Sequence, residues 1–251
     1  MGIHIETLER ATLDAVAPQH IEELPGWLLP MDPSSIGRAT SAVPLAHDGL
    51  RPTDIPTIEA RYAERQFAAR FRVADSPGLV AICRELHWRG YQAERPTLTR
   101  LCPVSHLQDC ADGLSVSVSS TPTAPWQSVY TADGFDPVDG AQRAAALSRS
   151  QVVVYACIED DRGAVAAGTA SLSRDWMGLH GIRTVPRARG QGLAAQILAA
   201  LARQAMQQGI ERAFLQVEED NTAANALYDR LRFTTAWRYR YWNQKLPAPH
   251  A

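Results

Sequence analysis

A dominant charge is missing from this sequence. Its 251 residues include 25 Lys and Arg against 27 Asp and Glu, for a formal net charge of −2. Proteins that bind nucleic acid or anionic membranes through their overall field carry a clear excess of positive charge. The balance therefore argues against both kinds of partner, and we expect a small or neutral one.

Cysteine is scarce and poorly spaced for metal binding. The four cysteines, Cys83, Cys102, Cys110 and Cys157, contain no CxxC pair. The sequence therefore indicates neither a zinc site nor a disulfide framework. We expect no bound metal and a reducing, cytoplasmic location.

Export signals and long apolar runs are also missing. The N-terminus has no basic stretch followed by an apolar core, and Glu6 stands where a myristoylation signal requires Ser or Thr. The longest apolar helical run, residues 193–206, contains Gln196, Arg203 and Gln204, which are costly on a lipid-facing helix. We expect a soluble protein with no membrane partner.

The chain is long enough for two domains. Residues 115–125 alternate like an edge strand and then turn into a Pro- and Thr-rich stretch that favours extended linker conformations. We place the domain boundary near Ser120, which divides the chain into residues 1–120 and 121–251.

The hydrophobic patterning predicts an α/β (α+β) fold with a mixed, mostly antiparallel sheet flanked by helices. In the first half we predict helices over 7–16, 57–66 and 78–88 and strands over 27–29, 37–45 and 97–102. In the second half we predict a helix over 140–147, a meander of strands over 151–158, 164–172 and 176–184, a helix from Gly190 to Gly209, a strand over 213–217, a helix over 222–231 and a strand over 233–242. After the first of these helices the order is β-β-β-α-β-α-β.

The two halves also share a faint echo. A helix followed by residues 86–91 and a strand resembles a helix followed by residues 228–233 and a strand. This predicts a duplicated fold in which only the second copy has a glycine-rich turn, although similarity at this length also arises by chance.

That glycine-rich turn offers a site for an anion. The first amides of a helix have no intrahelical partner, and the helix dipole adds positive charge there, so a diphosphate can be bound by the backbone. Gly190 and Gly192 let a ligand approach closely, and Arg187 and Arg189 add charge. A plain strand-to-helix turn, with glycines for tightness, is the alternative.

Two familiar phosphate-binding loops are absent, because neither GxxxxGK[ST] nor GxGxxG with a downstream acid occurs. The stretch Ile182-Arg-Thr-Val-Pro-Arg-Ala-Arg-Gly-Gln-Gly-Leu-Ala194 instead resembles the acetyl-CoA motif of the GNAT superfamily of N-acetyltransferases. The pattern of that motif, [RQ]xxGx[GA], is matched by Arg189, Gly192 and Ala194.

A second GNAT signature, NxxAxxLYxxxGF, resembles residues 221–233, roughly thirty positions after the first. One position departs from it, because Arg232 replaces the glycine. An arginine there must adopt a left-handed conformation or let the helix end differently. Two signatures in the expected order are a specific signal.

The resemblance covers residues 126–242. The segments 26–29 and 36–45 look like the N-terminal half of two-copy bacterial members. It implies a GNAT fold in two copies, with a degenerate N-terminal domain (1–120), a catalytic domain (121–251) and acetyl-CoA as co-substrate. The coenzyme-binding residues that it implies are Ile182, Arg183, Thr184, Arg189, Gly190, Gln191, Gly192, Leu193, Ala194 and Asn221.

Within the family, the phenol corresponding to Tyr228 is the general acid that protonates the departing thiolate. The alternative for Tyr228 is a core residue of an amphipathic helix. His180 occupies a strand position where family members carry a residue that faces the acceptor, and imidazole can take a proton from an amine. A packed strand histidine is the alternative.

Other candidates lie near the same cleft. Glu218 and Glu219 rival His180 as the proton acceptor, unless they are only a solvated strand end. Asn221 is expected to cap the next helix and, by resemblance, to contact the coenzyme. The aromatic cluster of residues 237–242 either walls the acceptor site or packs in a core. We also expect the segment 172–177 to help select the acceptor.

The leading hypothesis is therefore an acetyl-CoA-dependent N-acetyltransferase that acts on a small amine or amino-acid-like acceptor by direct transfer in a ternary complex. An acetyl-CoA-binding sensor without turnover and a protein or peptide N-acetyltransferase are the alternatives. The sequence leaves open the acceptor and whether the protein is a monomer or a homodimer.

Overall fold

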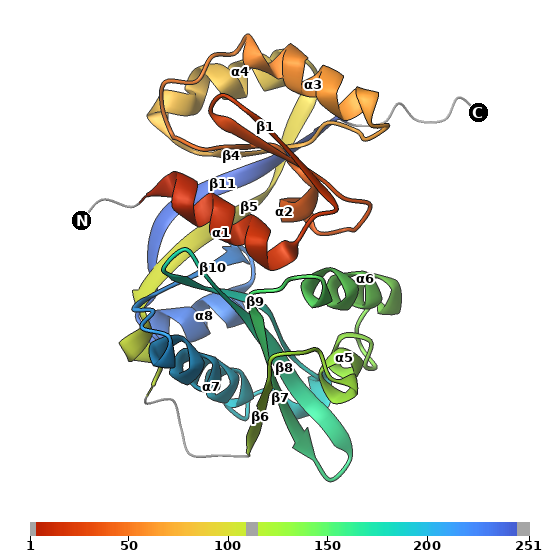
Figure 1. Ribbon diagram of the computed structural model, residues 1–251, viewed down its shortest axis with the longest axis vertical. Coiled ribbons are helices and arrows are strands. Elements are labelled where there is room, and N and C mark those ends of the chain that lie inside the picture. The colour runs from red at the N-terminus through yellow and green to blue at the C-terminus, as the bar shows by residue number, and fades with distance from the viewer. Residues whose placement is uncertain (1–3, 109–114, 245–251) are drawn as a thin grey trace.

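Both halves of the chain contribute to one eight-stranded sheet (Figure 1). The computed structural model describes residues 4–108 and 115–244, so Cys110 lies outside the described residues. In sheet order the strands are β4 (Phe71–Ala74), β11 (Thr234–Gln244), β5 (Tyr91–Pro103), β10 (Arg212–Glu218), β9 (Trp176–Thr184), β8 (Gly163–Ser173), β7 (Val153–Asp160) and β6 (Val116–Ser119). Neighbouring strands in this sheet are antiparallel except for the parallel pair β9 and β10.

The second half follows the predicted order. Strands β7, β8 and β9 form the antiparallel meander, followed by α7 (Leu193–Gln207), β10, α8 (Thr222–Arg230) and β11. Helix α6 (Pro137–Ser148) confirms the predicted helix over 140–147 and extends it at its start. The predicted mixed, mostly antiparallel sheet flanked by helices is confirmed.

One helix of the second half was not predicted. The Pro- and Thr-rich stretch was expected to be an extended linker, but α5 (Ala124–Tyr130) begins there. The Thr123 side chain accepts a hydrogen bond from the Trp126 amide, and Pro125 lies in the first turn, where a missing amide costs nothing. Thr and Pro therefore start a helix at this point.

The first half contains α1 (Ile5–Val16), α3 (Asp54–Glu64), a 3-10 turn (Pro77–Leu79) that leads into α4 (Val80–Trp88), and a second 3-10 turn (Val104–Leu107) after β5. A separate small sheet has the order β1 (His20–Leu24), β2 (Trp27–Met31) and β3 (Val43–Pro44). Its strand β1, paired with β2, was not predicted.

The predicted strand over 37–45 is wrong. The chain forms the short helix α2 (Gly37–Thr40) before it reaches β3. Ile36 and Ala39 are both buried, and their spacing of three residues brings them to one face of a helical turn. A run that resembled an alternating strand was therefore one helical turn followed by a very short strand.

The two halves exchange their last strands. Each half ends with a helix followed by a long strand, α4 with β5 and α8 with β11. Strand β11 lies between β4 and β5, and β5 lies between β11 and β10. Both helices are followed by a left-handed residue, Gly90 (φ 84°) and Arg232 (φ 60°), so of the two alternatives for Arg232 the structure has the left-handed conformation. The sequence echo thus corresponds to a structural repeat.

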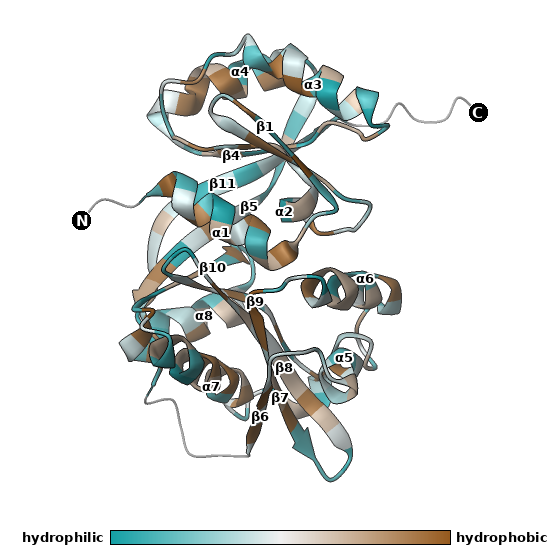
Figure 2. Cartoon of the chain, in the orientation of Figure 1, coloured by the Kyte–Doolittle hydropathy of each residue, from teal (hydrophilic) through white to brown (hydrophobic). Residues whose placement is uncertain are grey.

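Helix α1 lies between the halves. Its Leu8 and Ala11 are fully buried against Trp176 and Phe214 of the second half. Hydrophobic residues gather on the strands of the second half, where α5 and α7 cover them (Figure 2). The contact fixes the first half beside β9 and β10, which matters for the site. None of the helices in residues 4–108 and 115–244 is long and apolar enough to cross a membrane.

Candidate functional site

The sheet opens in its middle, between β9 and β10. These two strands pair only from Trp176 to Leu179 and from Arg212 to Leu215. Beyond this point β9 continues along β8, and β10 continues along β5. The separation leaves an unpaired strand edge on each side of a wedge.

A β-bulge shapes the β9 side of the wedge. The register between β8 and β9 shifts so that Gly168 faces both Gly181 and Ile182. Gly181 has a φ of 62°, and a Cβ added there would lie 2.4 Å from the Tyr130 hydroxyl oxygen. That hydroxyl donates a 2.7 Å hydrogen bond to the Gly181 carbonyl. Tyr130 of α5 therefore holds the bulge in place, a role that the sequence did not reveal.

Two backbone amides of β9 face the wedge. The Val185 amide donates to the Val165 carbonyl on β8 at 2.9 Å. Because successive strand residues direct their amides to opposite sides, those of Thr184 and Ile182 point to the unpaired edge. The amide of Arg183 points back to β8, so only two of the three predicted residues offer a donor here.

The start of α7 forms a cradle of free amides. Gly190 and Gly192 have φ values of 79° and 75°, and a Cβ added to either would meet no atom within 4 Å. Within the described part of the chain, the amides of residues 190–194 have no acceptor, whereas those of Ala195 and Gln196 both donate to the Gly192 carbonyl. A helix N-terminus of this kind binds anions through its amides and its dipole.

The two arginines beside the cradle behave differently. Arg189 lines the adjacent cavity, with its guanidinium carbon 5.9 Å from the centre of the Phe135 ring. Arg187 instead binds the carboxylate of Asp160 through both terminal nitrogens, and this pairing lowers the pKa of Asp160 to about 2. The expectation that Arg187 adds charge to the anion site is therefore wrong.

Two cavities meet in the wedge. The larger, of about 750 Å³, runs along the cradle and the end of β9. The smaller, of about 270 Å³, lies between the two halves of the chain. Both are lined by Ile182, Arg183, Asn221, Ala224 and Tyr228. Among the predicted coenzyme-binding residues, Gln191 is the one that lines neither cavity.

Tyr228 stands where the cavities join. Its side chain is largely buried, its ring packs edge-on against Phe233 at 5.5 Å, and its hydroxyl has no hydrogen-bond partner in residues 4–108 and 115–244. Burial raises the pKa of Tyr228 to about 12, although the charge of Arg100 opposes the shift. The phenol therefore keeps its proton at neutral pH and can donate it into the junction.

His180 is the first residue of β9 beyond the paired segment. It lines the smaller cavity, is 2 % exposed, and neither ring nitrogen has a hydrogen-bond partner in the described structure. Burial lowers the pKa of His180 well below its usual range, and the charge of Arg38 lowers it further. The imidazole is therefore neutral at physiological pH, with a nitrogen lone pair available.

The two predicted glutamates separate. Glu218 is exposed and lines the smaller cavity, whereas the carboxylate of Glu219 accepts a 2.7 Å hydrogen bond from Arg238. The Asn221 side chain accepts a hydrogen bond from the Ala224 amide at 3.2 Å, which confirms the predicted helix cap. Asn221 also lines both cavities.

The aromatic cluster of residues 237–242 packs in a core and also contributes to the wall of the smaller cavity. Tyr239, Tyr241 and Trp242 all belong to the core of the first half, and Trp237 packs at its edge. Of these residues, Tyr239 and Tyr241 also line the smaller cavity. The prediction that the segment 172–177 helps to select the acceptor is wrong. It forms the turn between β8 and β9, at the end of β9 that lies away from the wedge.

The first half supplies a wall that sequence reasoning missed. Arg38 of α2 and Arg95 of β5 line the smaller cavity, as does Arg143 of α6 in the second half. No motif marks these positions. Arg38 lies in the segment that was expected to be a strand, so neither its direction nor its distance from β10 could be inferred.

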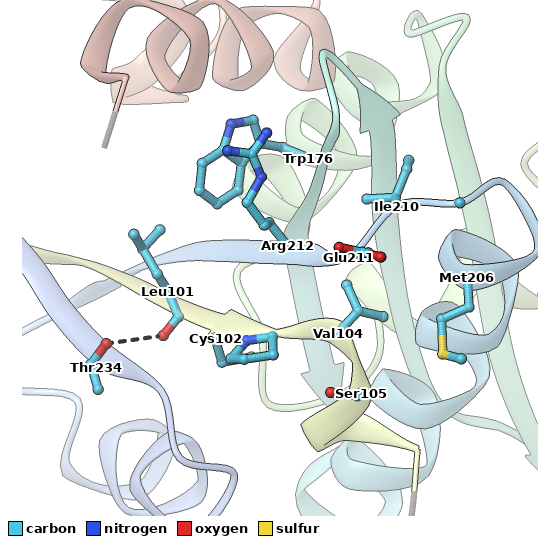
Figure 3. Close-up of a pocket in the computed structure, with 12 residues that line it drawn as sticks. Leu101, Cys102, Val104, Ser105, Trp176, Met206, Ile210, Glu211, Arg212 and Thr234 are labelled. Atoms are coloured by element: carbon cyan, nitrogen blue, oxygen red, sulfur yellow. Dashed lines mark hydrogen bonds between the residues drawn. The ribbon is translucent and has the colours of Figure 1, made fainter. Parts of the chain in front are cut away.

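A separate hollow of about 750 Å³ lies at the other end of β9 and β10 (Figure 3). Its walls include Leu101, Met206 and Arg212, whose guanidinium lies over the Trp176 ring at 4.5 Å. A hollow of about 740 Å³ occurs at the matching place in the first half, among α3, the loop before β4, the end of α4, the start of β5 and the end of β11. We attribute both to the repeated fold, because no predicted catalytic or coenzyme-binding residue lines either one.

The meander, the bulged and splayed central strand and the amide cradle on the following helix together define a GNAT fold. The chain belongs to the family described as "Probable histone acetyltransferase Rv0428c C-terminal", whose sequence model matches residues 3–242. A curated relative, the "Uncharacterized N-acetyltransferase YobR" of Bacillus subtilis (strain 168), is 34% identical over 82 residues. That match spans 33% of this chain and 33% of the relative, so only a third of the relative's length is covered.

Solved structures share the fold over nearly the whole chain. A GCN5-related N-acetyltransferase from Kribbella flavida has a TM-score of 0.71 at 18% identity, covering 99% of this chain and 98% of its own. A tandem GNAT protein from the clavulanic acid biosynthesis pathway has a TM-score of 0.63 at 11% identity, covering 94% of both chains. At these identities the likeness establishes the fold, including its two-copy arrangement.

Proposed function

We propose that the chain is a cytoplasmic N-acetyltransferase that transfers the acetyl group of acetyl-CoA directly to a small amine. The observation that carries this proposal is the meeting of two cavities at Tyr228. The larger extends to a set of free amides suited to a diphosphate, and the smaller is closed by the first half of the chain. Family membership supports the same class of reaction.

We assign the coenzyme to the larger cavity. Its diphosphate is assigned to the amides of residues 190–194 and to Arg189. The pantetheine chain is assigned to the unpaired edge of β9, where the Thr184 amide can bind it as an added strand would. This arrangement leads the thioester toward Tyr228 and Asn221, which line both cavities.

The reaction forms one C–N bond and breaks one C–S bond, and protons move to complete it. The acceptor nitrogen attacks the acetyl carbonyl carbon, a C–N bond forms, and the C–S bond breaks as the electron pair leaves on sulfur. Tyr228 gives its proton to that sulfur, and the nitrogen loses its proton to His180, Glu218 or water. The Ile182 amide, on the unpaired edge of β9 where the two cavities meet, stabilises the charge that develops on the carbonyl oxygen.

Calorimetry and a thiol-release assay on the purified full chain test this proposal. We expect one acetyl-CoA to bind per chain, and free thiol to appear only when an amine acceptor from a broad panel is present. Binding without thiol release from any amine would favour the sensor alternative. If acetyl-CoA does not bind at all, the proposal is wrong from its first step.

A further inference from the structure

We infer that the acceptor carries an anionic group, such as a carboxylate, in addition to its amine, and that Arg38 binds this group. The inference rests on the proposed function and names the substrate class of the smaller cavity. It follows from the charges that line this cavity, from the partners of each charge and from the way Arg38 is held.

Positive charge dominates the walls of the smaller cavity. Four arginines line it, Arg38, Arg95, Arg143 and Arg183, against the single carboxylate of Glu218. This local excess contrasts with the balanced charge of the whole chain. A cavity of this kind attracts anions and repels groups that carry several positive charges.

Three of the four arginines are paired with carboxylates of the protein. Asp139 accepts hydrogen bonds from Arg143 at 2.7 Å and from Arg183 at 3.2 Å. The Arg95 Nε atom lies 3.7 Å from a carboxylate oxygen of Glu94. Arg38 has no carboxylate partner in residues 4–108 and 115–244, so its charge is the one left for a ligand.

Arg38 is held in place by neutral groups. Its Nη1 atom donates a 3.2 Å hydrogen bond to the Gln216 side-chain oxygen, and the Gln216 nitrogen donates at 3.2 Å to the Thr12 hydroxyl. Its Nε atom is buried without an acceptor, and Nη2 has none among the described residues. Buried donors without acceptors are costly, and a carboxylate is a group that a guanidinium can bind through two nitrogens.

His180 provides an independent sign of a ligand in the same cavity. Both of its ring nitrogens are buried and lack partners, and β9 places it beside the junction with the coenzyme cavity. A small acceptor can therefore place its carboxylate on Arg38 and its amine between His180 and the thioester. Gln216 and His180 are the first residues of β10 and β9 beyond the paired segment, so both side chains belong to the narrow end of the wedge, where the two strands begin to separate.

The size of the cavity points to the same class. About 270 Å³ is just below the roughly 300–1,000 Å³ typical of small-molecule sites, so one amino-acid-sized molecule fits. A lysine-rich peptide would bring further positive charges to a cavity that is already lined by arginines. The structure therefore favours a free, carboxylate-bearing amine over a basic protein tail.

Matched substrate pairs test the inference on the full chain. Thiol release is measured for a panel of L-amino acids and for their primary amides, which have nearly the same size but no carboxylate. We expect a preference in kcat/KM for the carboxylate form of about 10- to 100-fold, mainly through KM, in the best pair. Arg38→Gln should reduce this preference to about threefold or less, and Arg38→Lys should restore part of it.

Arg61→Gln is the control, because Arg61 is a partly exposed α3 residue that lines neither cavity. It should leave the preference unchanged. Calorimetric binding of acetyl-CoA to each variant shows whether the coenzyme site is intact, and a thermal melt shows whether the chain is folded.

The outcomes separate the inference from the proposed function. If amines are acetylated but the amides, or a lysine-rich peptide with a blocked N-terminus, react as well as the amino acids, the inference is wrong and the proposed function stands. If no amine is acetylated, the proposed function fails. The inference then survives only if amino acids, and not their amides, stabilise the CoA-bound protein in a melt that Arg38→Gln abolishes.

Discussion

Helices α7 and α3 occupy matching places in the two halves, each before a strand that pairs with the exchanged strands, yet they begin differently. At α7 the amides of residues 190–194 are free. At α3 the amides of Asp54 and Ile55 donate to the carbonyls of Arg51 and Pro52, and the Asp54 carboxylate lies 3.5 Å from the Arg51 guanidinium. An acid in the first turn already occupies the positive end of the dipole. The fold is thus repeated, but the anion site is not.

The same contrast holds at α4 and α8, the helices that precede the exchanged strands. Counted from the left-handed residue that follows the helix, Leu86 corresponds to Tyr228. Leu86 is fully buried in a hydrophobic core, whereas Tyr228 faces two cavities. At the matching positions the first half therefore has neither the amide cradle nor the phenol. What it contributes instead is α2 with Arg38, which closes the acceptor cavity of the other half.

Substitution of one buried tyrosine in each half should give the largest difference between the two halves. Tyr228→Phe removes the proposed proton donor, so we expect kcat to fall by about 100- to 10,000-fold while the affinity for acetyl-CoA stays the same. Tyr62→Phe is the control in the first half, where the hydroxyl donates to the Pro30 carbonyl at 2.9 Å. It should cost about 1 kcal/mol of unfolding free energy and leave kcat unchanged. Steady-state kinetics that show equal kcat for Tyr228→Phe and the parent would remove Tyr228 from the mechanism.

Two glycines with nearly the same φ provide a matched pair, for which we expect an effect of intermediate size. Gly192 before α7 and Gly49 before α3 have φ values of 75° and 72°, and neither would meet protein atoms through a Cβ. Alanine at either position should cost about 1 kcal/mol of unfolding free energy, because left-handed backbone is unfavourable for it.

Only Gly192→Ala should weaken acetyl-CoA binding, by about tenfold or more, because its methyl group enters the space assigned to the diphosphate. Calorimetry on both variants measures this difference. Equal affinities for Gly192→Ala and Gly49→Ala would mean that the cradle does not bind the coenzyme.

The smallest expected effect concerns pH. The pKa of His180 is lowered well below its usual range in the folded protein, so the unfolded chain binds the extra proton first as the pH falls below about 6.5. Stability is therefore lost on the acid side. His180→Asn should reduce the loss of unfolding free energy between about pH 7.5 and pH 5.5 by about 1 kcal/mol.

His47 in the first half is the comparison for this titration. Burial lowers the pKa of His47 as well, but the charge of Asp48 opposes the shift. His47→Asn should therefore reduce the acid loss by less than His180→Asn does. Urea unfolding at the two pH values measures both, and an unchanged loss in His180→Asn would contradict the buried, neutral state of this residue.

The second half of the fold was predictable because its signals are local. The strand meander, the glycine turn at residues 190–192 and the capped helix after Asn221 each depend on residues that are neighbours in the chain. For Arg232 the sequence allowed either a left-handed conformation or a different helix end, and the structure has the first. The assignment of residues 1–120 and 121–251 to separate domains stays a proposal, and the exchanged strands β5 and β11 cross between them.

Other parts of the site were not predictable, because they depend on contacts between distant segments. Tyr130 holds Gly181 across 51 positions, and Arg38 reaches Gln216 across 178. Arg187 appeared equivalent to Arg189 in the motif, but among the described residues Arg187 pairs with a carboxylate, that of Asp160, and Arg189 with none. The sequence shows which residues are charged, but it does not show which of them form ion pairs in the folded protein.

The sequence by itself determined that a helix begins after a glycine-rich turn, and therefore that its first amides are available to an anion. It also determined the order of strands and helices around that turn, because hydrophobic periodicity and capping act over a few residues. Only the tertiary structure decided that strands exchange between the halves, that α2 closes the smaller cavity and that Arg38 is left unpaired there. These features arise where segments far apart in the chain pack together. No local sequence pattern specifies the free energy of such contacts.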